Sequence, residues 1–241
     1  MKVYSTEGII FRVLKYSETS IICDIFTREK GLRSYIVSGV RTTKAGQKAA
    51  IYRPLNIVNL VSYDMEHDKL ARITEISLSV HYQNINIDVI ISSIAIFMLE
   101  VCRNAIKERE ANEELYLFLT EWLDFLDKKE QFNPSLHLLF MVEMSAYLGF
   151  GPMKNHSSSR PYFDMLEGMY CDYHAGSEYI LDGTSSKTLH DLSLTNRFSI
   201  GQLAISKPDR AALTDNLIKY YQLHISGFRD LNSLDVLRNV L

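Results

Sequence analysis

The sequence predicts an α+β fold, in which a small five-stranded barrel at the N-terminus precedes an all-helical domain. Over the first 80 residues, short runs of apolar and β-branched residues alternate with turn residues. From about residue 88, apolar residues recur at spacings of three and four, which is the period of amphipathic helices. The chain has 241 residues, 46% of them apolar and 23% charged. This is ordinary globular composition, with enough apolar material to bury a core.

Five runs of the first segment are predicted strands. They cover residues 7–14, 19–27, 32–40, 56–63 and 70–78. Gly31 closes the turn between the second and third strands, because glycine tolerates the positive φ of a tight hairpin. Three strands, a break of about 15 residues and two further strands fit a Greek-key barrel such as the OB-fold. Barrels of this kind commonly bind oligonucleotides or sugars, so we expect a binding domain over residues 1–80.

The remaining chain is predicted to be helical, with one irregular insertion. A helix is expected from residue 89 to about 101, and a second follows Asn112, a favourable N-cap residue. Pro134 is well placed to begin a third helix. Two further helices are expected over residues 206–224 and from residue 233. We therefore expect a helical domain over residues 81–241, with an irregular insertion at about 153–183 that is rich in Ser, Gly and Tyr.

Charge is distributed unevenly along the chain. The formal net charge is −3, which would ordinarily argue against a polyanionic partner. Residues 1–80 nevertheless carry 12 basic and 8 acidic groups, whereas residues 81–150 carry 5 and 11. Within the first segment, residues 28–53 hold seven Lys or Arg and one Glu. This basic run favours nucleic-acid binding by the barrel, although edge strands also carry such charges simply to prevent aggregation.

No pattern typical of an enzyme is present. The sequence lacks a Walker phosphate loop, a Gly-x-Ser-x-Gly elbow, a His-Glu-x-x-His pair and a Gly-x-Gly-x-x-Gly fingerprint. We therefore expect no catalytic residues. Three cysteines lie far apart, which is typical of a reducing cytoplasm, and no apolar segment is long enough for export or for a membrane span.

The insertion raises the question of a zinc site. Cys171 and His174 have a spacing that lets both side chains reach one metal ion, and His156 lies upstream. A structural zinc ion needs four ligands, usually in two such pairs, and no second pair is present. We expect an irregular or hairpin segment without metal, with zinc as the alternative.

Several strings resemble the RecO family of bacterial recombination mediators. The most specific are Glu7–Arg12, Tyr16–Ser20, Phe26–Gly31 and Gly39–Arg41 with Lys44, in the order and spacing of that family's N-terminal signature. Residues 147–152 and 220–224 are similar to its later segments. The resemblance implies an N-terminal OB-fold, a helical domain and, in many members, a zinc ribbon formed by two Cys-x-x-Cys pairs. Here the first pair is replaced and the second ends in His174.

The resemblance also implies a function and partners. The family binds single- and double-stranded DNA, anneals complementary strands, contacts RecR and the single-strand-binding protein, and helps to load RecA in the cytoplasm at the nucleoid. We expect phosphate contacts from basic side chains, in a first group of Arg41, Lys44 and Lys48 and a second group of Arg28, Lys30 and Arg33. Tyr35 shares a strand face with Arg33 and is able to stack on a base, although taken alone it is equally well explained as a core residue. The alternative is a protein-interaction adaptor whose barrel does not bind DNA.

Overall fold

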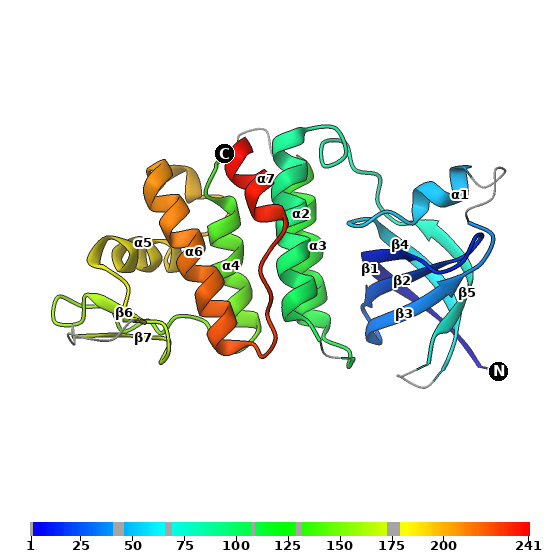
Figure 1. Cartoon of the computed structure of the whole chain (residues 1–241), viewed down its shortest axis with the longest axis horizontal. Coiled ribbons are helices and arrows are strands. Elements are labelled where there is room, and N and C mark those ends of the chain that lie inside the picture. The colour runs from blue at the N-terminus through cyan, green and yellow to red at the C-terminus, as the bar shows by residue number, and fades with distance from the viewer. Residues whose placement is uncertain (1, 41–45, 66–68, 108, 129–131, 173–178) are drawn as a thin grey trace. The chain divides into compact units, whose positions relative to one another are not determined.

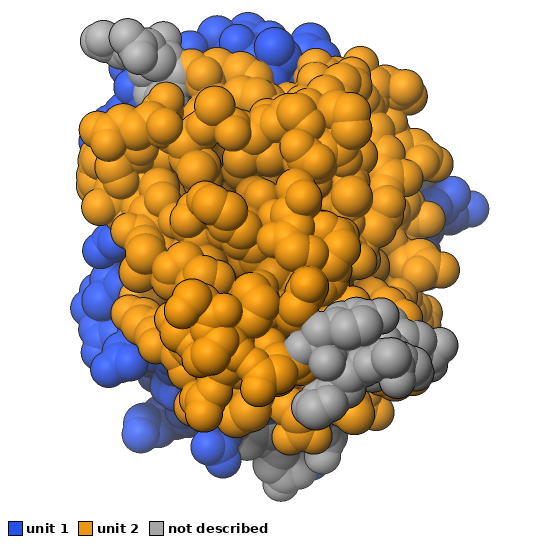
Figure 2. Space-filling model, turned by 90° about the vertical axis from the view of Figure 1, so that its left-hand side faces the viewer, with its two compact units in different colours: residues 1–91, 106–128 blue, residues 92–105, 129–241 orange. Residues whose placement is uncertain are grey.

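The computed structural model describes residues 2–40, 46–65, 69–107, 109–128, 132–172 and 179–241, and for residues 46–48 it describes the backbone alone (Figure 1). The chain divides into two compact units (Figure 2). The first contains residues 1–91 and 106–128, and the second contains residues 92–105 and 129–241. No helix of the described residues is long and apolar enough to span a bilayer.

The first unit is built on a closed five-stranded barrel, as predicted. Its strands are β1 (Val3–Lys15), β2 (Ile21–Thr27), β3 (Gly31–Val37), β4 (Ile57–Tyr63) and β5 (Ala71–Leu78). They pair in the order β1-β2-β3-β5-β4 and close back onto β1. All neighbours are antiparallel except β3 and β5, which are parallel and pair only at Tyr35 with Ala71 and at Ile36 with Arg72. This short parallel contact leaves a weak seam in the barrel wall.

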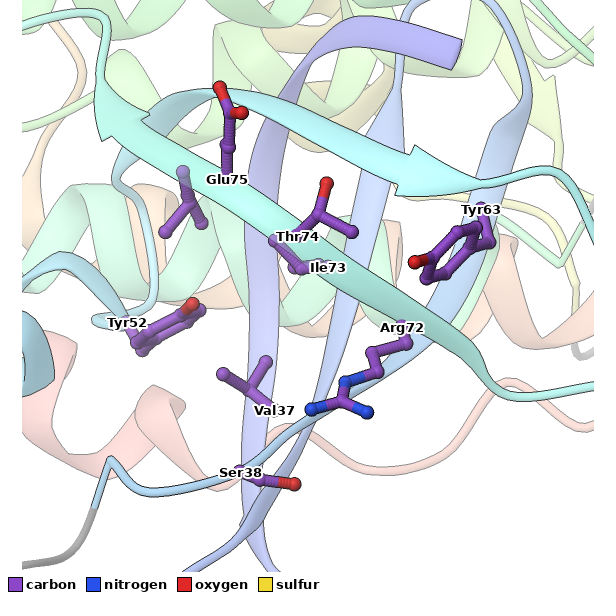
Figure 3. Close-up of a pocket in the computed structure, with 9 residues that line it drawn as sticks. Val37, Ser38, Tyr52, Tyr63, Arg72, Ile73, Thr74 and Glu75 are labelled. Atoms are coloured by element: carbon purple, nitrogen blue, oxygen red, sulfur yellow. The ribbon is translucent and has the colours of Figure 1, made fainter. Parts of the chain in front are cut away.

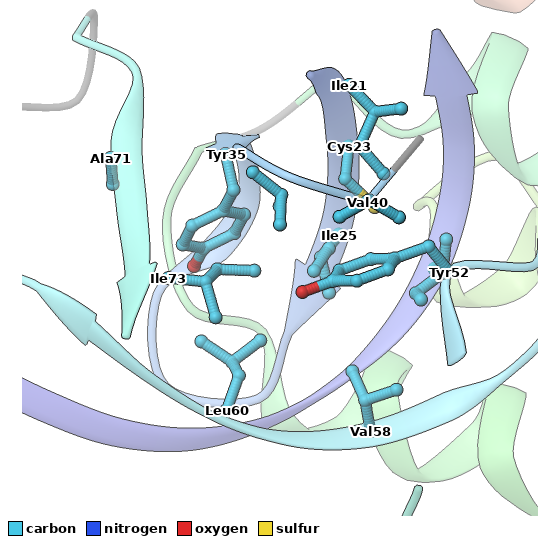
Figure 4. Close-up of a cluster of buried hydrophobic side chains, with 12 residues drawn as sticks. Ile21, Cys23, Ile25, Tyr35, Val40, Tyr52, Val58, Leu60, Ala71 and Ile73 are labelled. Atoms are coloured by element: carbon cyan, nitrogen blue, oxygen red, sulfur yellow. The ribbon is translucent and has the colours of Figure 1, made fainter. Parts of the chain in front are cut away.

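Alternation of side chains along each strand fills the barrel interior. Residues on the inner faces of all five strands form one apolar cluster, closed at one end by Tyr52 (Figure 4). Tyr52 follows the short helix α1 (Gly46–Ile51), which the sequence analysis did not predict. Six residues carry too little helical periodicity to stand out, and α1 is stabilised by its place against the barrel rather than by its own propensity.

The predicted turn at Gly31 is confirmed. Gly31 has a φ of 64°, and a Cβ atom at this position would collide with the backbone carbonyl of Glu110. Glycine is therefore required at this position for two reasons. The backbone is left-handed here, and the segment before α3 (Glu113–Lys128) approaches it closely.

The first unit also includes α3. The Asp127 carboxylate accepts hydrogen bonds of 2.8–2.9 Å from the backbone N–H groups of Gln83, Asn84 and Ile85. Phe26 of β2 lies 6.2 Å from Tyr116 of α3 between ring centroids. These contacts group α3 with the barrel in one compact unit. The predicted domain boundary at residue 80 stays a prediction.

The second unit is mainly helical. It contains most of α2 (Val89–Ala105) together with α4 (Leu136–Tyr147), α5 (Gly183–Ser193), α6 (Lys207–His224) and α7 (Ser233–Val240), and a short 3-10 turn at Ile200–Gln202. Helix α4 packs against α5 and α6, and nine of its twelve residues are buried, which accounts for its largely apolar sequence. The insertion forms a small hairpin of β6 (Tyr162–Asp164) and β7 (Met169–Cys171). Helix α5 was not predicted, because only four of its residues are buried.

Candidate nucleic-acid interface

The basic run extends from the β2–β3 turn to just beyond α1. Arg41 and Lys44 lie outside the described residues, and the side chain of Lys48 does too, although its backbone belongs to α1. The role of these three residues as phosphate contacts therefore stays a prediction.

Arg28 and Lys30, at the β2–β3 turn, are already paired with carboxylates. The Arg28 guanidinium forms an ion pair with Glu113, in which Nε donates to Oε1 at 2.9 Å. The Lys30 ammonium lies 3.3 Å from the Asp64 carboxylate and 5.3 Å from the centroid of the Tyr4 ring. Both side chains are partly exposed, so a phosphate can reach them. A phosphate would have to compete with these carboxylates, so Arg28 and Lys30 should bind it more weakly than unpaired cations would.

Arg33 and Tyr35 share one face of β3, as their spacing predicts, but that face is the inner one. Tyr35 is completely buried in the barrel core, and its hydroxyl lies 2.7 Å from the hydroxyl of Tyr4. A buried ring cannot stack on a base, which corrects the predicted role of Tyr35. Arg33 is only 8% exposed and offers little of its surface to a phosphate.

The structure shows a pocket that the sequence analysis missed. It has a volume of about 760 Å³ and lies at the seam where β3 and β5 part (Figure 3). Residues from β3 and its end, from the chain after α1, and from β4 and β5 line this seam pocket: Val37, Ser38, Tyr52, Tyr63, Arg72, Ile73, Thr74, Glu75 and Ile76. Its size falls within the range of small-molecule sites.

A β-bulge in β5 shapes this pocket. Val61 pairs with Glu75 but Ser62 pairs with Ile73, so Thr74 is an extra residue in β5. Two side-chain bonds hold the bulge, from Thr74 Oγ1 to the Val61 carbonyl and from Ser62 Oγ to the Arg72 carbonyl, each 3.1 Å long. Bulges bend a strand and redirect its side chains. Here the bulge begins where the pairing of β3 with β5 ends, and this leaves the barrel wall open.

Comparison with known proteins identifies the family. A family model described as "Recombination protein O N terminal" matches residues 1–82, and one described as "Recombination protein O C terminal" matches residues 88–235. The chain belongs to the RecO family. It is 34% identical over 237 residues to the DNA repair protein RecO of Flavobacterium psychrophilum, and 33% identical over the same length to that of Flavobacterium johnsoniae. Each match covers 98% of this chain and 98% of the relative.

The RecO-family insertion is held together by aromatic side chains among the described residues. His156 stacks on His190 with ring centroids 4.1 Å apart and meets the edge of Tyr170 at 5.0 Å. Cys171 lies at the end of β7, and His174 lies outside the described residues. Within the described part of the chain, no three His, Cys, Asp or Glu side chains group to bind a metal ion. His156, Cys171 and His174 are three donors, and a structural zinc ion needs four.

The second unit of this RecO-family chain carries a smaller pocket of about 220 Å³ between α4, α6 and α7. Leu234, Leu237 and Leu241 give it an apolar wall, and Lys207 and Arg210 add positive charge. Arg238 also lines it but is ion-paired with Asp215. His137 of α4 is fully buried at its base, where its Nε2 lies 3.0 Å from the Thr214 hydroxyl. An apolar pocket with cations around it suits a ligand that is both apolar and acidic.

Proposed function

We propose that this protein is a DNA-binding recombination mediator, which binds single- and double-stranded DNA through its barrel and anneals complementary strands. With RecR, it would help to load RecA onto DNA coated by single-strand-binding protein. The observation that carries this proposal is a closed barrel with a strongly basic run over residues 28–53, in a chain of the RecO family. Curated relatives named DNA repair protein RecO match it over nearly their whole length.

The mechanism we propose needs no covalent chemistry. Annealing brings two polyanions together, and cations on the protein reduce the repulsion between their phosphates. Such contacts position a strand without reading its sequence, so we expect little sequence preference. Because Arg28 and Lys30 already pair with Glu113 and Asp64, we expect Arg41, Lys44 and Lys48 to supply most of the binding.

Charge reversal of the first group tests this proposal. In the triple variant Arg41→Glu, Lys44→Glu and Lys48→Glu, we expect lower affinity for a mixed-sequence single strand. The slope of log affinity against log salt should become shallower by about 2, since each contact contributes about 0.7. Fluorescence anisotropy at several salt concentrations measures both quantities.

A matched variant controls for net charge. Lys154→Glu, Arg160→Glu and Lys187→Glu reverses three cations of the second unit, and it should leave the salt slope close to that of the wild type. An unchanged slope in the first triple variant would favour the alternative function, an adaptor protein whose barrel does not bind DNA.

The pocket between α4, α6 and α7 supports a partner proposal. A disordered tail with acidic and apolar residues, such as that of the single-strand-binding protein, could place its apolar groups against Leu234 and Leu237 and a carboxylate near Lys207. Binding of a labelled tail peptide should then weaken in Lys207→Glu. Equal binding by the wild type and by this variant would exclude the pocket as the docking place.

A further inference from the structure

The seam pocket of the barrel combines apolar, aromatic and charged side chains. We propose that it receives one unstacked base of single-stranded DNA, while Arg72 at its edge contacts an adjoining phosphate. This inference rests on the proposed DNA binding and adds a base-binding subsite to it. Of the predicted residues whose side chains the structure describes, none of Arg28, Lys30, Arg33 and Tyr35 lines this pocket.

The first argument is the way the pocket is constructed. The Thr74 bulge and its two side-chain bonds hold β5 away from β3 just beyond the pair of Ile36 with Arg72. The pocket thus has a floor of core residues, Val37, Tyr52 and Ile73, and a mouth of exposed ones, Ser38 and Arg72. An apolar floor below a polar mouth suits a flat heteroaromatic ring that remains attached to a charged backbone.

The second argument is the chemistry at the mouth. Since Ser62 pairs with Ile73 in an antiparallel ladder, Tyr63 and Arg72 are the next residues across these two strands, and Figure 3 shows the Arg72 guanidinium extending toward Ser38. Within the described residues Arg72 forms no ion pair. Single-strand binders combine aromatic rings that stack on bases with cations that hold phosphates, and Tyr63 and Arg72 supply one of each to this pocket.

Glu75 restricts how a nucleotide can enter. Glu75 also lines the pocket, and Figure 3 shows its carboxylate extending away from Tyr52 and Val37. A negative charge on that side would repel a phosphate, so we place the phosphate on the Arg72 side. The hydroxyls of Tyr52 and Tyr63 point into the space between them (Figure 3) and add further polar partners for a base edge.

A base-binding pocket distinguishes single strands from duplexes, whereas phosphate contacts do not. In a duplex the bases are stacked and paired, and removing one from the stack costs a few kcal/mol. The seam pocket therefore contributes only to single-strand binding. This difference separates the present inference from the general proposal of DNA binding.

An abasic oligonucleotide tests the inference directly. It keeps every phosphate of a mixed-sequence single strand but lacks the bases over its central positions. We expect wild-type affinity for the abasic strand to be about tenfold lower, which is at the lower end of the effect of stacking one base. Tyr63→Leu removes the ring, and Ser38→Leu narrows the mouth at an exposed position. Both variants should bind the intact strand about tenfold more weakly than the wild type does. Their affinity for the abasic strand should be no lower than their affinity for the intact one.

Two controls make the result decisive. Tyr147→Leu removes a half-exposed tyrosine of the second unit and should behave like the wild type on both strands. Duplex affinity should stay within about twofold in all three variants. If Tyr63→Leu and Ser38→Leu keep the wild-type preference for the intact strand, the base pocket is refuted, while the salt-slope test still decides whether the barrel binds DNA. If Tyr63→Leu fails to fold, Ser38→Leu alone decides.

Discussion

At the scale of single residues, burial decides what a side chain can do. The alternation along β3 correctly placed Arg33 and Tyr35 on one face. A period of two defines two faces but does not say which of them lines the core, and Tyr35 proved to be on the inner one. Its hydroxyl is satisfied by Tyr4, and burial raises the pKa of both phenols. Tyr35 is thus a core residue with a polar partner.

His137 makes the stability of the second unit depend on pH. Burial, with a smaller contribution from Arg210, lowers the pKa of His137 to about 3. The unfolded chain binds a proton near pH 6.5, whereas the folded chain does not, so stability is lost as the pH falls below about 6.5. We expect about 2 kcal/mol less stability at pH 5 than at pH 7 from this group, as measured by urea unfolding.

The control for His137 is a neutral side chain of similar size. His137→Gln keeps a partner for the Thr214 hydroxyl but has no proton to gain, so its stability should fall less between pH 7 and pH 5. An equally steep loss in this variant would show that other groups cause the pH dependence.

At the scale of elements, the sequence predicted the strands and helices whose apolar residues recur regularly. It missed the features that depend on how two strands pair. All five strands and the helices α2, α3, α4, α6 and α7 were predicted within a few residues. Helix α5 has an Asp182 N-cap but too few apolar residues to show a period. The seam pocket depends on the extra residue Thr74, and only the register of β5 against β4 shows that residue to be a bulge. Register is a property of two strands together and cannot be read from either alone.

Helix α7 is fixed at its start by Glu100 of α2. The Glu100 carboxylate accepts four hydrogen bonds of 2.6–3.0 Å, from the backbone N–H and side chain of Asn232 and of Ser233. Partial burial acts to raise the pKa of Glu100, but these bonds outweigh it and lower the pKa. The carboxylate thus caps the N-terminus of α7, although it belongs to a different helix.

Glu100→Ala should therefore loosen α7 selectively. The loss of these bonds should cost about 1–2 kcal/mol, because the N–H groups at the start of α7 lose their acceptor. Hydrogen exchange of the α7 amides should accelerate, while exchange in the barrel should not change. Glu167→Ala, at an exposed position of the same unit, serves as the control. Uniformly faster exchange over the second unit would contradict a local capping role.

At the scale of the whole molecule, the net charge of −3 combines parts of opposite sign. The basic barrel segment and the acidic segment after it are joined by an ion pair, since Arg28 of the β2–β3 turn contacts Glu113 of α3 in the first unit. Glu113 thus pairs with a cation that would otherwise be available to a phosphate.

Neutralising that carboxylate should strengthen DNA binding. In Glu113→Gln, Arg28 loses its charged partner and becomes free to contact a phosphate, so the slope of log affinity against log salt on duplex DNA should steepen by up to about 0.9. Glu114→Gln makes the same change in net charge one residue away, where the carboxylate is exposed, and should steepen the slope much less. If both variants behave alike, general repulsion by α3 controls binding. A steeper slope in Glu113→Gln alone would mean that the pair with Arg28 restrains binding.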